Sequence, residues 1–81
     1  TFTRFVAVGM GGNAVKFLPE IDIAVFDLYG DSDLSSVLES VKDRLNASKN
    51  NKAYFQKMVN SDHFFNDKDE LLISEVSEWL K

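Results

Sequence analysis

The sequence predicts an α/β fold: a short parallel sheet in a three-layer arrangement, formed by a β-α-β-α-β-α order within one domain, 1–81. Two observations carry this prediction. Three β-rich apolar runs are each followed by a helical pattern, and strands that alternate with helices form parallel sheets with right-handed crossovers. No linker or low-complexity segment divides the chain, so the elements are expected to share one core.

The first strand and helix are expected in the N-terminal quarter of the chain. The run "FTRFVAVG" (2–9) is mostly apolar and rich in β-formers, which predicts a buried strand. "GMGGNAVKFL" (9–18) follows, with glycines for a tight turn and a short helical stretch that we expect Pro19 to end.

The second strand is the most apolar. "IDIAVFDLYG" (21–30) is nearly continuous in apolar residues, which suits a strand covered on both faces. Ser32 or Asp33 is expected to cap the helix that follows within 33–50. The apolar stripe of that helix consists of Leu34, Val37, Leu38, Val41 and Leu45.

The third strand and last helix complete the order. "KAYFQKMV" (52–59) alternates only partly, which favours a strand nearer the sheet edge. "DKDELLISEVSEWLK" (67–81) begins with acids that favour a helix N-terminus. Its apolar face consists of Leu71, Leu72, Val76, Trp79 and Leu80.

The composition excludes several classes of protein. An apolar content of 44% argues against disorder, and a net charge of −4 without a basic patch disfavours binding to nucleic acid or anionic membranes. The chain has no cysteine and one histidine, which leaves no thiolate zinc site or disulfide framework. No apolar run is long enough for a membrane span. We therefore expect neither a metal nor a cofactor.

Three loops should meet at one edge of the sheet. In open parallel sheets, ligands bind at the carboxyl ends of the strands. The loops there are "GMGGN", "GDSD" and "NSDHFFND", and they bring together glycine amides, carboxylates and the only imidazole, His63.

From Ile21 to Lys81 the chain resembles the C-terminal portion of an α/β-hydrolase. Gly30-Asp31-Ser32-Asp33 matches the G-x-x-D pattern of the family's late strand, with Asp33 in the place of the triad acid. "MVNSDHFF" matches the loop that carries the triad histidine, with His63 in that position, and "SEVSEWLK" matches the closing helix. The resemblance implies that Asp33 orients His63 and that His63 acts as a general base.

The front of the chain matches the family less closely. A nucleophile elbow reads G-x-S-x-G after a strand, and here the serine position falls on Gly9. The Met10 amide would be the oxyanion donor. Gly9 has no side chain to attack a carbonyl, so we expect no acyl-transfer activity, although the parent chemistry would be hydrolysis of an ester or similar small acyl substrate. Some bacterial hydrolase-like families of unknown function show such glycine-rich elbows.

The chain is also shorter than the family pattern. A whole hydrolase has a further strand, and usually a cap, between the elbow helix and the acid strand, where this chain has only Pro19 and Glu20. Two interpretations are open: a hydrolase-like protein without its nucleophile, or an excerpt of a larger hydrolase-like domain.

Other acids and aromatics near these loops have alternative interpretations. Asp31 is the second candidate partner for His63, and Asp62 is expected to be a turn residue. Asp27 interrupts a buried strand and needs a partner, for which Arg4 or Lys57 on the neighbouring strands could serve. Core positions are predicted for the aromatics Phe64, Phe65 and Trp79.

Two other functions fit parts of the sequence. "GMGGNA" fits the dinucleotide pattern G-x-G-x-x-A from Gly9 to Ala14, with Asp27 as the acid for a ribose hydroxyl. The chain could instead be a non-catalytic interaction module that self-associates through its two exposed sheet edges.

Overall fold

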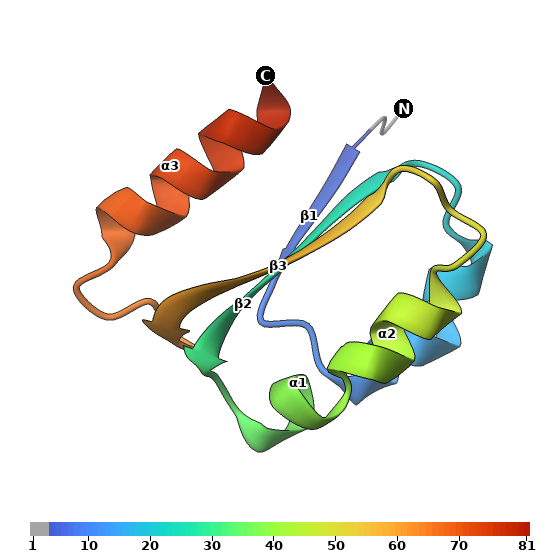
Figure 1. The fold of residues 1–81 in the computed structure, drawn as a ribbon, viewed down its shortest axis with the longest axis horizontal. Coiled ribbons are helices and arrows are strands. Elements are labelled where there is room, and N and C mark those ends of the chain that lie inside the picture. Colours follow the sequence, from blue (N-terminus) through green and yellow to red (C-terminus); the bar gives the residue numbers. More distant parts are fainter. Residues whose placement is uncertain (1–3) are drawn as a thin grey trace.

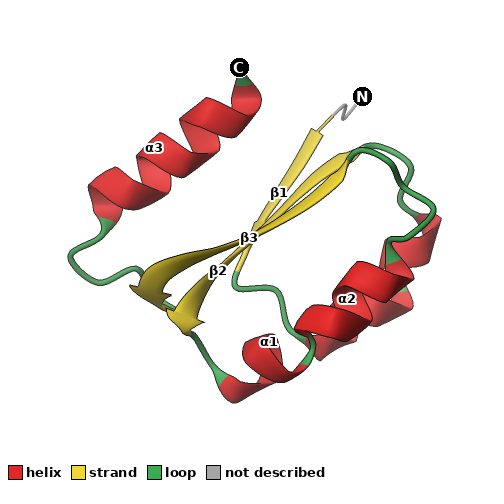
Figure 2. Cartoon of the chain, viewed as in Figure 1, coloured by secondary structure: helices red, strands yellow, loops and turns green. Residues whose placement is uncertain are grey.

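The computed structural model describes residues 4–81, and it confirms the predicted α/β architecture with a parallel sheet and helices on both of its faces (Figures 1 and 2). Predicted strand residues Phe2 and Thr3 lie outside the described part. The elements, in chain order, are β1 (Arg4–Val8), η1 (Gly12–Lys16), η2 (Leu18–Glu20), β2 (Ala24–Ser32), α1 (Ser35–Glu39), α2 (Val41–Ala47), β3 (Tyr54–Asp62) and α3 (Asp69–Leu80).

The strand order is β1-β2-β3, so β2 is the central strand and β3 lies at an edge, as its partial alternation predicts. Both pairings are parallel. The central position explains the apolar run of β2, because Val25, Phe26 and Leu28 are almost fully buried between the two helical layers.

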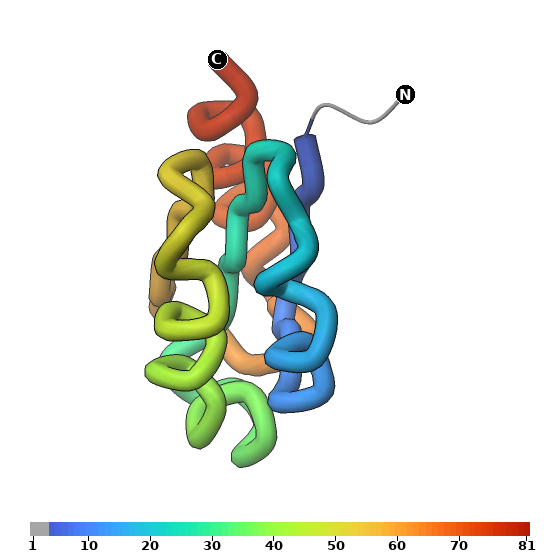
Figure 3. The backbone as a smooth tube through the Cα atoms, turned by 90° about the vertical axis from the view of Figure 1, so that its right-hand side faces the viewer, coloured from blue at the N-terminus to red at the C-terminus, as the bar shows by residue number. Residues whose placement is uncertain are grey.

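The helices are divided unequally between the two faces of the sheet. Helix α3 lies alone on one side, and α1, α2 and η1 lie on the other (Figure 1). Turned by 90°, the molecule shows η1 and α2 side by side on the second face (Figure 3). This arrangement gives the three layers.

The core under α3 is aromatic. The Phe26 ring stacks against Trp79, with centroids 5.1 Å apart, and against Phe55 at 5.7 Å. From α3, Leu72 and Val76 also pack against this core, whereas Leu80 at its end is exposed. The amphipathic pattern therefore predicts the inner positions Leu72, Val76 and Trp79 correctly and is wrong at Leu80.

The helix predicted within 33–50 is two helices. Ser40 lies between α1 and α2, and its hydroxyl donates to the carbonyl oxygens of Ser36 (2.7 Å) and Val37 (3.1 Å). Such bonds from a serine to the preceding turn bend helices. The first helical stretch also differs from expectation, because η1 ends at Lys16 and Pro19 lies inside a second 3₁₀ turn, η2.

The predicted apolar stripe of this segment is wrong in part. Val37 is buried, but Leu34, Leu38 and Leu45 are exposed, and Arg44 is fully buried in their place. The break at Ser40 turns α2 relative to α1, so that a single helical stripe no longer faces the sheet.

Arg44 is buried because it pairs with Asp27. Its Nε donates to Asp27 Oδ2 at 2.8 Å, and both side chains are fully enclosed. The predicted partners Arg4 and Lys57 are not used. Side chains alternate between sheet faces, and Lys57 is in register with Leu28, on the face opposite Asp27. Instead, Lys57 donates to Glu75 at 2.8 Å and Arg4 donates to the Leu80 carbonyl at 2.7 Å.

A polar network surrounds this ion pair. The Tyr54 hydroxyl donates to Asp27, and Gln56 donates to Tyr54 and to the Val41 carbonyl, each at 3.0 Å. Arg44 Nη1 donates to the Val37 carbonyl at 2.7 Å. Burial, followed by the hydrogen bond to Asp27, raises the pKa of the Tyr54 hydroxyl well above its ordinary value.

The first prediction concerns the buried charge. In an Arg44→Met variant the Asp27 carboxylate has no cation, so the free energy of unfolding should fall by about 3–5 kcal/mol in urea titrations. Replacing both charges, Asp27→Leu with Arg44→Met, should recover most of this loss. Lys42→Met, on the exposed side of α2, is the matched control and should change stability by less than about 0.5 kcal/mol. Equal losses of unfolding free energy for Arg44→Met and Lys42→Met would contradict the conclusion that Arg44 is the partner of the buried Asp27 carboxylate.

The second prediction concerns alkaline pH. The folded protein holds the Tyr54 proton more tightly than the unfolded chain, in which tyrosine titrates near 10.0. The stabilisation is therefore complete below about pH 10 and is lost as the pH rises further. Between about pH 9 and about pH 11, the free energy of unfolding measured in urea should fall more for the native sequence than for Tyr54→Phe. An identical pH dependence in both would contradict this prediction.

Candidate functional site

Three loops meet at one edge of the sheet because all three strands run parallel. β1, β2 and β3 end at Val8, Ser32 and Asp62, and the residues after them include Gly9, Asp33 and His63. The structure brings these three residues together, as their position at the carboxyl ends of the strands leads one to expect.

The G-x-x-D segment forms a turn closed from both ends. The Asp33 amide donates to the Gly30 carbonyl at 3.2 Å, and the Gly30 amide donates to Asp33 Oδ2 at 3.0 Å. A Cβ at Gly30 would lie 2.1 Å from the Ser61 carbonyl oxygen, so only glycine fits beside β3. Neither Ser32 nor Asp33 is the N-cap of α1; Leu34 holds that position, and its amide donates to Asp33 Oδ1 at 2.8 Å.

Asp33 and His63 are hydrogen-bonded. His63 Nδ1 lies 2.7 Å from Asp33 Oδ1. The Asp33 side chain is fully buried, whereas that of His63 is 26% exposed. A carboxylate can only accept, so we assign the proton to Nδ1, which leaves a lone pair on Nε2. Within residues 4–81, Nε2 makes no hydrogen bond.

Gly9 forms a tight corner under the imidazole. Its φ of +72° belongs to the left-handed region, which glycine adopts without a steric penalty. A Cβ at this position would lie 2.6 Å from both Cε1 and Nδ1 of His63. The ring therefore already fills the place of a Gly9 side chain. The next amide, of Met10, donates to no group in the described part of the chain.

The loop after His63 is held by Asp62. Its carboxylate accepts from the Asn66 backbone at 3.0 Å and from the Asn66 side chain at 2.6 Å. The bond from the Asn66 backbone is the main cause that lowers the pKa of Asp62. Phe65 and Asp67 both have positive φ, so the chain turns sharply twice before α3.

The two phenylalanines of this loop point in opposite directions. Phe65 belongs to the core, as predicted, but the core prediction for Phe64 is wrong, because its side chain is 76% exposed. The Phe64 ring lies edge-on to His63, with centroids 5.0 Å apart. It therefore presents an apolar surface beside the imidazole.

Asp31 does not contact His63. Its Oδ1 accepts from the Ser61 amide at 3.2 Å and from the Ser32 hydroxyl at 3.4 Å. Asp31 thus joins the ends of β2 and β3. The alternative prediction that Asp31 is the partner of His63 is therefore wrong.

Asp27 is not available to a nucleotide. It lies inside β2, fully buried, and its carboxylate is bonded to Arg44 and Tyr54. The segment after the glycines, η1, is a 3₁₀ helix of five residues, too short for the helix end that holds a pyrophosphate in dinucleotide folds.

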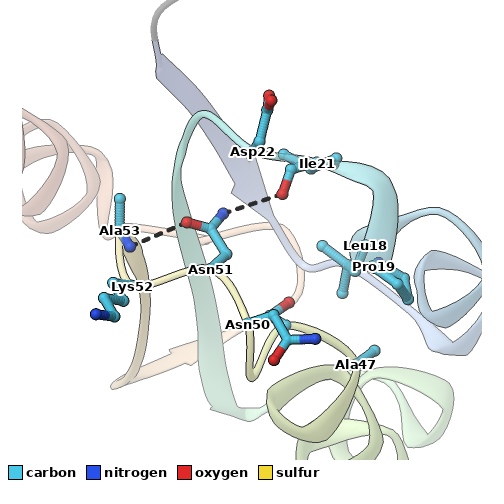
Figure 4. A pocket seen from close by; sticks show the side chains of 10 residues that line it. Leu18, Pro19, Ile21, Asp22, Ala47, Asn50, Asn51, Lys52 and Ala53 are labelled. Atoms are coloured by element: carbon cyan, nitrogen blue, oxygen red, sulfur yellow. Dashed lines mark hydrogen bonds between the residues drawn. The ribbon is translucent and has the colours of Figure 1, made fainter.

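The cavity in Figure 4 lies away from these residues. Its volume is about 390 Å³, and its lining residues precede β2 and β3, at the amino ends of the strands. Asn51 there donates to the carbonyls of Ile21 (3.4 Å) and Ile23 (2.9 Å) and accepts from the Ala53 amide (2.9 Å). These bonds join the two loops, so we assign Asn51 a structural role.

Neither a cluster of metal-ligating side chains nor a membrane-spanning helix is found in residues 4–81. No group of three or more histidine and acidic side chains there is placed to hold a metal ion. No helix in the same range is long and apolar enough to cross a membrane.

Two contacts at the site were not predicted from the sequence. Gly30 holds the Asp33 carboxylate through its amide, and Asn66 anchors the loop behind His63. The signal for Asn66 was present in the composition of "NSDHFFND", because Asn and Asp are typical of tight turns.

The third prediction concerns the Gly9 corner. A Gly9→Ala variant must adopt a left-handed conformation and displace the His63 ring, so the free energy of unfolding should fall by about 1–3 kcal/mol. The His63–Asp33 hydrogen bond should be lost, which NMR of the imidazole would detect. Gly12→Ala is the control, because its Cβ would meet Ser40 Cβ at an ordinary 3.6 Å. Equal losses of stability for Gly9→Ala and Gly12→Ala would contradict the close contact between Gly9 and the His63 ring.

Comparison with protein-family models, with curated proteins and with solved structures finds no match to this chain.

Proposed function

We propose that this chain is an α/β-hydrolase-like domain that binds a small acyl compound at the carboxyl ends of the strands. We call this place the strand-end rim; it consists of Gly9, Met10, Asp33, His63 and Phe64. The domain does not form a covalent acyl-enzyme. The observation that carries the proposal is the Asp33–His63 hydrogen bond directly above the Gly9 corner. An acid and an imidazole in this order, after the second and third strands, match the roles that the hydrolase resemblance implies.

Each residue of the rim has a role in this proposal. Asp33 holds the imidazole in the tautomer with the proton on Nδ1, so Nε2 accepts a hydrogen bond or proton from the ligand. The Met10 amide binds the carbonyl oxygen. Phe64 offers an exposed apolar surface for the acyl chain.

The position that the nucleophilic serine takes in the resemblance holds no nucleophile here. Gly9 has no side chain, and the chain has no cysteine. The hydroxyls at the ends of β2 and β3 have other partners: Ser32 donates to Asp31, and the buried Ser61 donates to the Asp62 carbonyl at 3.1 Å. Acyl transfer needs an activated oxygen or sulfur next to the base, so binding is the function that these residues support.

A second candidate is an interaction module. In the described part of the sheet, β1 pairs only with β2, and a cavity of about 370 Å³ at this edge is lined by Arg4, Phe5, Ile21 and Ile23. Exposed apolar strand edges favour pairing with another chain. A monomer in sedimentation experiments at high concentration would argue against this candidate.

The fourth prediction tests the binding function. Titration of ¹⁵N-labelled protein with hexanamide, a neutral acyl compound that resists hydrolysis, should shift the Met10 amide and the His63 ring resonances in a saturable way. His63→Phe should weaken this binding several-fold, since it removes the acceptor at Nε2, while Lys42→Gln on α2 should leave it unchanged. A fluorophosphonate probe should not label the native chain. Labelling, or the absence of any shift at Met10 and His63, would overturn the proposal.

A further inference from the structure

A further cavity lies where the three strands begin, at the end of the sheet opposite the strand-end rim. It is lined by residues at the start of each strand and by Trp79 near the end of α3, and its volume is about 470 Å³. The amino end of β1 and the C-terminal end of α3 lie at the same end of the molecule (Figure 1). Small-molecule sites typically have volumes of about 300–1,000 Å³, so this cavity is large enough for a ligand.

The apolar part of the lining is rich in aromatic surface. Phe55 and Trp79 both stack against the buried Phe26 ring, with interplanar angles of 24° and 18°. Phe55 is 49% exposed and Trp79 is partly exposed, so each ring keeps an accessible surface. The small side chains of Ala24 and Ala53 complete the apolar lining. A ligand with an aromatic group would remove this surface from water, which is favourable.

Two cations also line the cavity, Arg4 from β1 and Lys52 from the loop before β3. Within residues 4–81, neither of them forms an ion pair. Arg4 Nη1 donates to the Leu80 carbonyl at 2.7 Å, which holds the guanidinium near the end of α3. A guanidinium has five N–H groups, so this bond leaves most of them for a ligand.

The acids on the neighbouring surface of α3 have partners of their own. Glu75 is paired with Lys57, and Glu78 is paired with Lys81 at 3.2 Å. Among the residues that the structure describes, no acidic side chain lines the cavity. The whole chain carries a net charge of −4, so a cavity with two cations and no acid is opposite in sign to the chain as a whole. This local charge favours an anionic ligand.

We infer that this cavity binds a small carboxylate with an aromatic body, such as an arylalkanoate. The aromatic group packs on Phe55 and Trp79. The Arg4 guanidinium binds the carboxylate through two parallel hydrogen bonds, and the positive charge of Lys52 attracts the same group from the β3 side. The site is separate from the strand-end rim, so this inference does not depend on the proposed function.

The test is a titration of the native chain with 3-phenylpropionate, followed by tryptophan fluorescence. Trp79 is the only tryptophan of the chain, so the signal comes from the cavity itself. The fluorescence should change in a saturable way, and the affinity should fall at high salt, because salt screens exposed charges. The neutral 3-phenylpropanamide has the same aromatic body and should bind several-fold more weakly. Equal affinities for the two compounds, or no saturable change, would overturn the inference.

Charge variants separate the role of the cations from an effect on the fold. Lys52→Gln and Arg4→Gln should each weaken binding of the carboxylate by about two- to five-fold, the effect of a partly screened charge, and should leave binding of the amide unchanged. Lys42→Gln on α2 removes the same charge away from the cavity and should change neither affinity. An unchanged carboxylate affinity in both Lys52→Gln and Arg4→Gln, or an equal loss for the carboxylate and the amide, would contradict binding of the carboxylate by these cations.

NMR of ¹⁵N-labelled protein separates this site from the strand-end rim. 3-Phenylpropionate should shift the amides of Ala24, Ala53 and Phe55 and leave the resonances of Met10 and His63 in place. Shifts confined to Met10 and His63 would place the carboxylate at the strand-end rim, which would overturn this inference and leave the proposed function intact.

Discussion

The buried ion pair between Asp27 and Arg44 determines how one helical layer lies on the sheet. A carboxylate on the central strand has no access to water, so the fold must supply a cation and hydrogen bonds. Arg44 reaches Asp27 from α2 and also donates to the Val37 carbonyl of α1, which fixes the angle between the two helices at Ser40. As a consequence α1 is short. Because α1 begins two residues after Asp33, the contacts of Arg44 also limit the path of the chain that follows the Asp33 loop.

Asp27 inside β2 and Asp33 just after it have different surroundings. Asp27 is fully buried, between the buried guanidinium of Arg44 and the partly buried phenol of Tyr54. Asp33 lies at the strand end, where backbone amides of Gly30 and Leu34 satisfy its oxygens and its remaining partner is an imidazole with an exposed edge. The Asp33 carboxylate is therefore linked to a partly exposed imidazole, whereas the Asp27 carboxylate belongs to a buried network that stabilises the fold.

The sequence predicts the order of elements, the edge position of β3 and the meeting of the three strand ends, because all of these follow from local periodicity and the rules of parallel sheets. It does not predict the Arg44 pair, since that contact depends on how far α2 turns after the break at Ser40. Local sequence patterns also do not predict that Phe65 is buried while Phe64 is exposed. The two residues are chemically identical neighbours, and the positive φ of Phe65 directs it inward while Phe64 stays outside.

The glycine at position 9 and the close approach of the His63 ring both depend on one steric constraint. A ring 2.6 Å from the place of a Cβ is possible only above glycine, and only glycine adopts the φ of +72° without strain. If the site had simply lost a serine, the ring would stand back and leave a hollow at the corner. Instead Asp33 draws Nδ1 inward through a 2.7 Å hydrogen bond, and the ring fills the corner. The position of His63 is therefore determined by the acid on one side and by the bare backbone on the other, while Nε2 makes no hydrogen bond within residues 4–81.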